Sequence, residues 1–118
     1  MPITKIPGGG RQGGYITGTI PAGSTSTTAI DIEGYGIAGL SVPSMNTASL
    51  TFEASNTATG TFYGITSSAG TLLSLTTATG GKIISSDALT FLAGYRYIKV
   101  VATASQTASV DLTFILKA

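Results

Sequence analysis

The sequence predicts an all-β protein: a jelly-roll-like or Greek-key β-sandwich of about eight or nine strands with an extended N-terminal arm. Three observations support this prediction. Apolar and polar residues alternate with a period of two in successive short segments, which is typical of half-buried strands. Glycine-containing turn sequences separate these segments roughly every ten residues. The 118 residues include 20 threonines, and β-branched side chains favour strands over helices.

Residues 1–14 are predicted to form the arm, and residues 15–118 the single β-sandwich domain. Pro2, Pro7 and the run Gly8–Gly9–Gly10 indicate an extended segment without regular structure. A disordered tail is one interpretation of such a segment. The other is an arm held against the domain, a sister subunit or a larger partner. Its contact residues would be Lys5, Arg11, Gln12 and Tyr15.

In the first half of the domain, one predicted strand begins at Tyr15, and three more cover residues 25–33, 37–42 and 48–53. The run over 37–42 is almost continuously apolar, which indicates a central strand, and Pro43 ends it because proline cannot donate to the ladder. The predicted inward-facing residues are Ile16, Gly18 and Ile20, then Thr28, Ile30 and Ile32, then Ala48, Leu50 and Phe52. Asp31 and Glu33 are expected on the opposite, solvated face.

The second half predicts strands over 61–66, 72–77, 82–85, 95–102 and 109–117. Phe62 and Tyr63 are expected on opposite faces of the first of these strands. Ser86 and Asp87 either cap a single helical turn that runs to Leu92 or belong to a loop. The last strand alternates cleanly, and its predicted inward-facing residues are Val110, Leu112, Phe114 and Leu116.

The surface is predicted to carry unusually little charge. Charged residues make up 9% of the chain, against about 25% in an ordinary soluble domain, and the net charge is +1. The exposed faces must therefore consist mainly of Thr, Ser, Ala and Gly. Such a surface offers little charge to repel a neighbouring chain, so the composition favours a protein packed in an assembly.

Two classes of partner are not expected. The six basic residues are scattered rather than gathered in a stripe, which argues against nucleic-acid binding. No apolar run approaches the roughly 18 residues of a transmembrane helix, and the N-terminal segment shows no apolar core of a signal peptide. The chain has no cysteine, so neither a disulfide nor a cysteine metal site is expected.

The sequence predicts no enzyme, no catalytic residue, no cofactor and no metal. Histidine is absent, which removes the commonest general base and the commonest metal ligand. Asp31 and Glu33, two residues apart on one predicted strand, would lie about 6.5 Å apart on the same face, a spacing superficially suited to glycoside hydrolysis. A solvated outer face is the stronger interpretation of this pair.

Tyrosines are the candidate binding residues. Aromatic rings can form a platform for carbohydrate, and Tyr35, Tyr63 and Tyr95 are predicted as a glycan or partner surface. The alternative is that tyrosines line the rim of the sandwich with their hydroxyls in water.

Four segments together resemble the small β-sandwich virion proteins of tailed bacteriophages: Gly39–Pro43, Ala48–Ser55, Leu92–Val100 and Asp111–Leu116. The resemblance covers roughly residues 28–117, and its most specific part is the stretch Gly94-Tyr-Arg-Tyr-Ile-Lys-Val100. Two features depart from the pattern. The loop that follows Ser55 has Asn-Thr-Ala-Thr-Gly where an Asp-Gly turn is common, and Tyr95 stands where Trp is common.

The resemblance implies a capsid decoration (cement) protein or the base of a head fibre, located on the virion and made in the cytoplasm of a bacterial host. Its partners would be the major capsid protein or other virion proteins, with homo-oligomers (trimers or dimers) expected. The alternative is a tail, baseplate or head-fibre component that binds carbohydrate on the host surface. The resemblance carries no catalytic residue to this chain.

Overall fold

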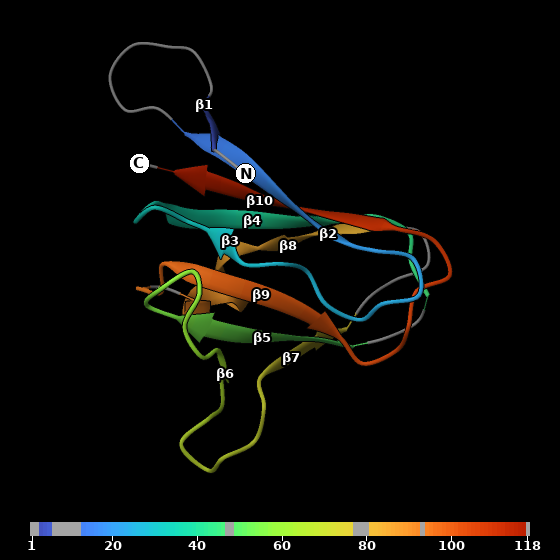
Figure 1. Ribbon diagram of the computed structural model, residues 1–118. Helices are drawn as coiled ribbons and strands as arrows, with labels where there is room; N and C mark the ends of the chain where they lie inside the picture. Colours follow the sequence, from blue (N-terminus) through green and yellow to red (C-terminus); the bar gives the residue numbers. More distant parts are fainter. Residues whose placement is uncertain (1–2, 6–12, 47–48, 77–80, 93, 118) are drawn as a thin grey trace.

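A computed structural model describes residues 3–5, 13–46, 49–76, 81–92 and 94–117. These residues form two packed antiparallel sheets and one 3₁₀ helix (Figure 1). The first sheet contains β1 (Thr4–Lys5), β2 (Gly14–Ile20), β4 (Gly36–Val42), β8 (Lys82–Ser85) and β10 (Val110–Lys117). The second contains β3 (Ile30–Asp31), β5 (Ser49–Ser55), β6 (Tyr63–Gly64), β7 (Ser74–Thr76) and β9 (Tyr97–Ala102). The 3₁₀ helix η1 covers Ser86–Leu92.

The strand pairing is that of a jelly roll. The first sheet has the order β1-β2-β10-β4-β8, and the second the order β3-β9-β5-β6, with β7 also pairing with β5. Strand β2 therefore pairs with β10, β3 with β9, β4 with β8, and β5 with β6 and β7. These are the pairs of one long antiparallel ribbon folded over on itself, with successive strands alternating between sheets until β5. The predicted jelly-roll-like sandwich is confirmed.

The core lies between the two sheets and follows the period-two pattern of the strands. Phe52 on β5 and Phe114 on β10 are its largest fully buried side chains, and they come from opposite sheets. All inward positions predicted on the last strand are buried, as are those predicted on β2. Each fully buried Leu, Ile or Phe contributes about 1.5–3 kcal/mol of transfer free energy, so this alternation is the main specification of the fold.

The segment 25–33 differs from its predicted form. Ile30 and Ile32 are buried as expected, but Thr28 is exposed and Thr27 is buried instead. The cause is a local exchange with β9: the N–H of Thr27 donates to the Val100 carbonyl at 3.0 Å, and the Thr27 Oγ1 accepts from the Val100 N–H at 3.1 Å. A side-chain hydroxyl thus replaces a ladder partner, and regular strand structure is limited to Ile30–Asp31.

Three other predicted strands are shorter than the pattern suggested. The segment 61–66 contains only β6, the described residues 72–76 contain only β7, and β9 begins at Tyr97 rather than at residue 95. Phe62 lies before β6, so the expected pair of Phe62 and Tyr63 on opposite faces is not formed within a strand.

The helical alternative for residues 86–92 is confirmed. The strand 37–42 is confirmed, and it lies between β10 and β8. Ala48 lies outside the described residues.

Part of the predicted arm belongs to the first sheet. Thr4 pairs with Tyr15 and Lys5 with Gly14, so a two-residue edge strand exists where no regular structure was expected. Arg11 and Gln12 lie outside the described residues, and only the backbone of Lys5 is described. Among the described residues, no helix is long and apolar enough to cross a membrane.

Candidate binding site

Three connections meet at one end of the sandwich, on the left in Figure 1. They are the β3–β4 turn (residues 32–35), the β5–β6 loop (residues 56–62) and residues 94–96, which precede β9. Because successive strands of a jelly roll alternate between the sheets, this end gathers residues that are far apart in the sequence. It contains all three tyrosines predicted as a binding surface.

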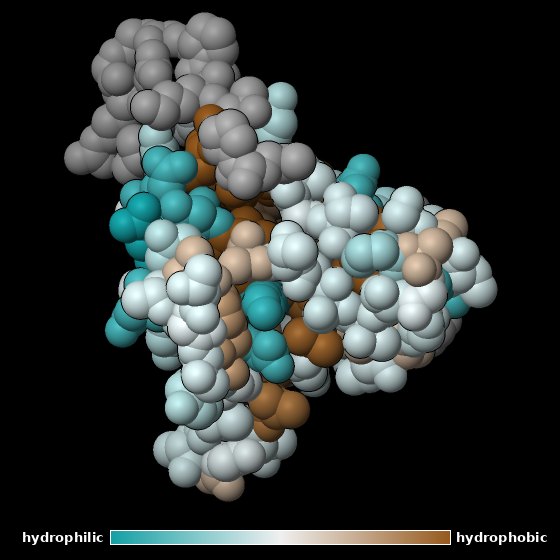
Figure 2. Space-filling model, in the orientation of Figure 1, coloured by the Kyte–Doolittle hydropathy of each residue, from teal (hydrophilic) through white to brown (hydrophobic). Residues whose placement is uncertain are grey.

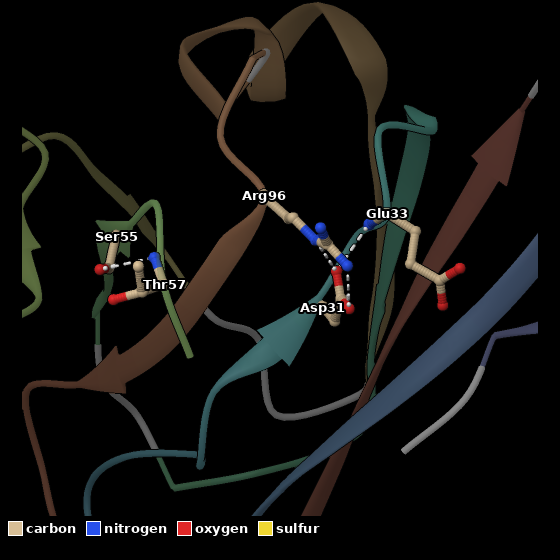
Figure 3. A network of polar contacts seen from close by, with 5 residues as sticks. All are labelled: Asp31, Glu33, Ser55, Thr57 and Arg96. Atoms are coloured by element: carbon tan, nitrogen blue, oxygen red, sulfur yellow. Dashed lines mark hydrogen bonds and ion pairs between the residues drawn. The ribbon is translucent and has the colours of Figure 1, made fainter. Parts of the chain in front are cut away.

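Arg96 ties the start of β9 to the end of β3. Its Nε donates to Asp31 Oδ1 at 3.0 Å, and its Nη2 donates to Asp31 Oδ2 at 3.2 Å (Figure 3). The backbone adds a third bond, because the Ile32 N–H donates to the Arg96 carbonyl at 2.8 Å. The bond from Arg96 lowers the pKa of Asp31 and raises the pKa of Arg96, so the pair is fully ionised at neutral pH.

Glu33 does not share a strand face with Asp31, so the expectation of two carboxylates on one strand is wrong. The strand ends at Asp31, whose Oδ1 accepts the N–H of Glu33 at 2.9 Å. This short turn places Glu33 in the left-handed region, at φ 56°. Its carboxylate points away from the ion pair, whereas that of Asp31 faces Arg96 (Figure 3). The two groups therefore form no facing pair of the kind that glycoside hydrolysis uses.

The β5–β6 loop is held by its own side chains. The N–H of Thr57 donates to Ser55 Oγ at 3.2 Å (Figure 3). Gly60 closes the same loop. A Cβ at this position would overlap Thr57 Oγ1 and lie 3.2 Å from Ser55 Oγ. A side chain at this position would therefore require Thr57 to move, so glycine permits the close approach seen in this loop beside Tyr63.

Tyr95 separates two hollows at this end of the molecule. On one side it lines a hollow of about 590 Å³ together with Tyr63, Asn56 and other residues of the β5–β6 region. On the other side it lines a hollow of about 420 Å³ with Tyr35, Glu33 and Arg96. The three predicted tyrosines thus occupy one continuous surface, with Tyr95 in the middle.

The larger hollow contains no charged residue. Its polar groups are the Asn56 amide and the hydroxyls of Ser55, Thr57, Thr61, Thr66, Tyr63 and Tyr95, and its apolar floor includes Ile65 and Ala54. Tyr63 is 72% exposed and Tyr95 39% exposed, so both rings are accessible from solvent. The smaller hollow is different, because Glu33 and Arg96 bring charge to it.

A third hollow, of about 570 Å³, is lined by residues of β4 and η1, and it shares Tyr35 with the second. Asp87 at the start of η1 is its acidic residue. The Ser85 hydroxyl donates to Asp87 Oδ1 and lowers the pKa of that carboxyl. Asp87 lies in the first turn of the 3₁₀ helix, where a negative charge is favourable.

The remaining predicted contact residues do not belong to this site. Tyr15 lies on β2, is 44% exposed, and faces outward from the first sheet beside Ile115. Lys5 pairs with Gly14 through its backbone.

Sequence reasoning missed Arg96 and Asn56 as site residues. The signal for Arg96 was present, because this basic residue stands between Tyr95 and Tyr97, two residues after Gly94. Its partner Asp31, 65 residues earlier, could not be identified from periodicity.

Among the described residues, no group of three or more Asp, Glu, His or Cys side chains is placed to hold a metal ion. No protein-family model, curated protein or solved structure matches this chain.

Proposed function

We propose that this chain is a structural protein of a tailed-bacteriophage virion, a capsid decoration protein that binds the outer surface of the major capsid protein and stabilises the shell. The observation that carries the proposal is the outer face of the β1-β2-β10-β4-β8 sheet. Two complete rows of residues cross four strands of this face without a single charge. We call these two rows the uncharged face; the charged residues Asp111 and Lys117 lie on β10 at either end of them.

The rows follow from the strand register. One row runs from Thr17 through Thr113 and Ser41 to Ile83, and the next runs from Tyr15 through Ile115 and Gly39 to Ser85. A Cβ at Gly39 would lie 3.5 Å from Ile83 Cγ2 and 3.6 Å from Ile115 Cδ1. The two isoleucines therefore flank Gly39. Together they form a small apolar patch in the middle of a face whose other residues in the two rows mostly carry hydroxyl groups.

Covering this face with another protein costs little free energy. Thr17 Oγ1 and Thr113 Oγ1 already share a hydrogen bond of 2.9 Å, and Thr19 Oγ1 donates to Asp111 Oδ1 at 2.6 Å. These hydroxyls keep partners when water is removed, and no ion has to be desolvated in the two rows. Ile83, which is 68% exposed, would gain favourable burial in such an interface. Most of the surface visible in Figure 2 has the pale colour of residues between the hydrophilic and hydrophobic extremes.

The jelly roll itself adds a weaker argument by analogy, since this architecture is common in viral capsid proteins and also in lectins and cupins. In the proposed role the chain acts without catalysis or a cofactor, forms trimers or dimers on the particle, and uses residues 1–14 as a further contact. The resemblance to virion β-sandwich proteins supports the same role.

The experiment compares Ile83→Lys with a matched control, Leu72→Lys. Both residues are exposed aliphatics, but Leu72 lies in the β6–β7 connection, outside the uncharged face, and is 50% exposed. Particles of the virus that encodes the chain are purified after complementation with each variant. The copy number of the chain per particle is then measured by quantitative mass spectrometry.

The proposal expects the native chain and Leu72→Lys to occupy the particle fully, and Ile83→Lys to be depleted at least about tenfold. A native chain missing from purified particles would overturn the virion assignment. Equal occupancy by all three proteins would overturn the assignment of the uncharged face. Melting temperatures of the purified variants confirm that both fold.

A further inference from the structure

We propose that the hollow between Tyr63 and Tyr95 is a binding site for a neutral saccharide. The site lies within one chain and is independent of the proposed attachment to a capsid. It occupies the loop end of the sandwich, whereas the uncharged sheet face proposed to meet the capsid is made by the strands of the first sheet.

The chemistry of the lining selects the ligand class. A neutral saccharide offers hydroxyl groups that both donate and accept hydrogen bonds, and ring faces that carry C–H groups. The hollow offers hydroxyls and the amide of Asn56, which also donate and accept. Its volume of about 590 Å³ falls within the roughly 300–1,000 Å³ of small-molecule sites.

The tyrosine rings supply the apolar half of the recognition. The face of an aromatic ring is electron-rich, so it attracts the weakly positive C–H groups of a sugar ring. Tyr63 lies on a two-residue edge strand and is 72% exposed, an unusual position for so large an apolar surface. Tyr95 lines the same hollow and is 39% exposed. A saccharide lying between them would cover apolar surface on both rings.

Charge excludes other ligands from the same hollow. None of its lining residues carries a charge, so an anion or a cation would lose hydration without an ionic partner. The charged residues around the hollow lie outside its lining. Glu53 pairs with Gly64 and with Lys99 in the second sheet, and the Lys99 ammonium lies 4.5 Å from the centroid of the Phe62 ring. Beyond Tyr95, Arg96 is already bound to Asp31, and the Glu33 carboxylate remains outside that pair. An acidic sugar that extends past Tyr95 would approach this carboxylate. We therefore expect neutral sugars to bind better than sialylated or sulfated ones.

Contacts within the chain restrain part of the lining of the hollow before a ligand arrives. The Thr57–Ser55 bond and the close approach at Gly60 hold one wall, and the Arg96–Asp31 pair holds the residue next to Tyr95. Preorganisation of this kind lowers the entropy lost on binding.

The test uses the purified chain and a glycan array that contains neutral hexose and N-acetylhexosamine oligosaccharides beside sialylated and sulfated ones. The best neutral oligosaccharide is then titrated by NMR against four proteins: native, Tyr63→Ala, Tyr63→Phe and Tyr15→Ala. Tyr15 is the matched control, because it is an exposed tyrosine on the sheet face, outside the hollow.

We expect Tyr63→Ala to weaken binding about tenfold, Tyr63→Phe to retain most of it, and Tyr15→Ala to leave it unchanged. Chemical shifts should change in residues 54–66 and at Tyr95. The proposal is overturned if no neutral oligosaccharide binds at about 10 mM, if acidic sugars bind as well as neutral ones, or if Tyr15→Ala weakens binding as much as Tyr63→Ala. None of these outcomes depends on whether the chain occupies a capsid.

Discussion

Arg96 binds Asp31 through two hydrogen bonds, of 3.0 and 3.2 Å, and this pair joins the start of β9 to the end of β3 across 65 residues of sequence. The residue before Arg96 is Tyr95, which lines both hollows at this end. The ion pair is therefore a positioning device for the candidate binding surface, and its contribution to global stability is secondary, because Arg96 is 57% exposed.

We expect the protein to lose stability in acid as Asp31 becomes protonated and its ion pair with Arg96 is lost. The folded pKa of Asp31 lies below its ordinary value of 3.8, chiefly because of the hydrogen bond from Arg96. Asp31 therefore stabilises the fold fully above that ordinary value, and the contribution disappears as the pH falls through the lower folded pKa. Melting temperatures of native, Asp31→Asn and Arg96→Gln proteins, measured from neutral pH to about pH 2, check this.

Both variants should melt no more than about 3 °C below the native protein at neutral pH and should lose less stability than it does below pH 3.8. Parallel curves for all three proteins would mean that Asp31 is not coupled to Arg96 in solution.

Gly18 is expected to be intolerant of even one added carbon. It lies in the middle of β2, and a Cβ there would overlap Ile30 Cδ1 and lie 2.9 Å from Ile30 Cγ1. Gly18→Ala should destabilise the fold by about 1–3 kcal/mol in urea unfolding. Adding Ile30→Val removes the overlapping methyl group, so the double variant should recover part of that loss. Strict additivity of the two changes would disprove the proposed contact.

Gln106 is a buried polar residue at the other end of the sandwich, and we expect the stability of the fold to depend on its hydrogen bonds. Its side chain is 2% exposed; Oε1 accepts from the Asn46 N–H at 2.8 Å, and Nε2 donates to the Ala104 carbonyl at 3.0 Å. Gln106→Met keeps the shape but leaves both backbone groups without this partner, so it should cost about 1–3 kcal/mol. The exposed control Ser109→Ala should change stability by less than about 0.5 kcal/mol. Equal effects in the unfolding titration would refute the assigned role.

Removal of residues 1–13 is expected to lower occupancy on the particle. The truncation deletes β1, which pairs with β2 through only two residues, and Ile3, which packs against the core. The cluster of buried residues is otherwise kept, so the melting temperature should fall only modestly. Capsid binding should fall because the proposed arm contacts are lost. Copy number per particle, measured beside the full chain, checks this prediction, and unchanged occupancy would remove the arm from the account.

Alternation in the sequence was sufficient to predict the sandwich, because a period of two links directly to burial. The last strand illustrates this, since Val110, Leu112, Phe114 and Leu116 are all buried as predicted. The pattern failed where side chains bond to the backbone of a distant strand. Thr27 shows why: its hydroxyl binds Val100, a residue that no local pattern connects to it. The predicted strand position of Glu33 was wrong for a related reason: the Asp31 side chain accepts the Glu33 N–H and stabilises a turn there.

The candidate site was predicted in part. Tyr35, Tyr63 and Tyr95 were chosen for their chemistry alone, and the jelly-roll connections bring them to one end of the molecule. What sequence could not provide was the neutral lining around Tyr63, since it depends on the β5–β6 loop folding beside residues 94–96. The pairing of Arg96 with Asp31 likewise needed the topology.

The central claim is that this jelly roll binds a capsid by the uncharged face of its first sheet. A cryo-electron microscopy reconstruction of particles from the virus that encodes the chain tests it most directly. The account predicts density for the sandwich on the outer shell, with Thr17, Thr113 and Ile83 toward the capsid protein and Tyr63 exposed to solvent. Density that places the loop end with Tyr63 against the shell, or particles that lack the sandwich altogether, would contradict it.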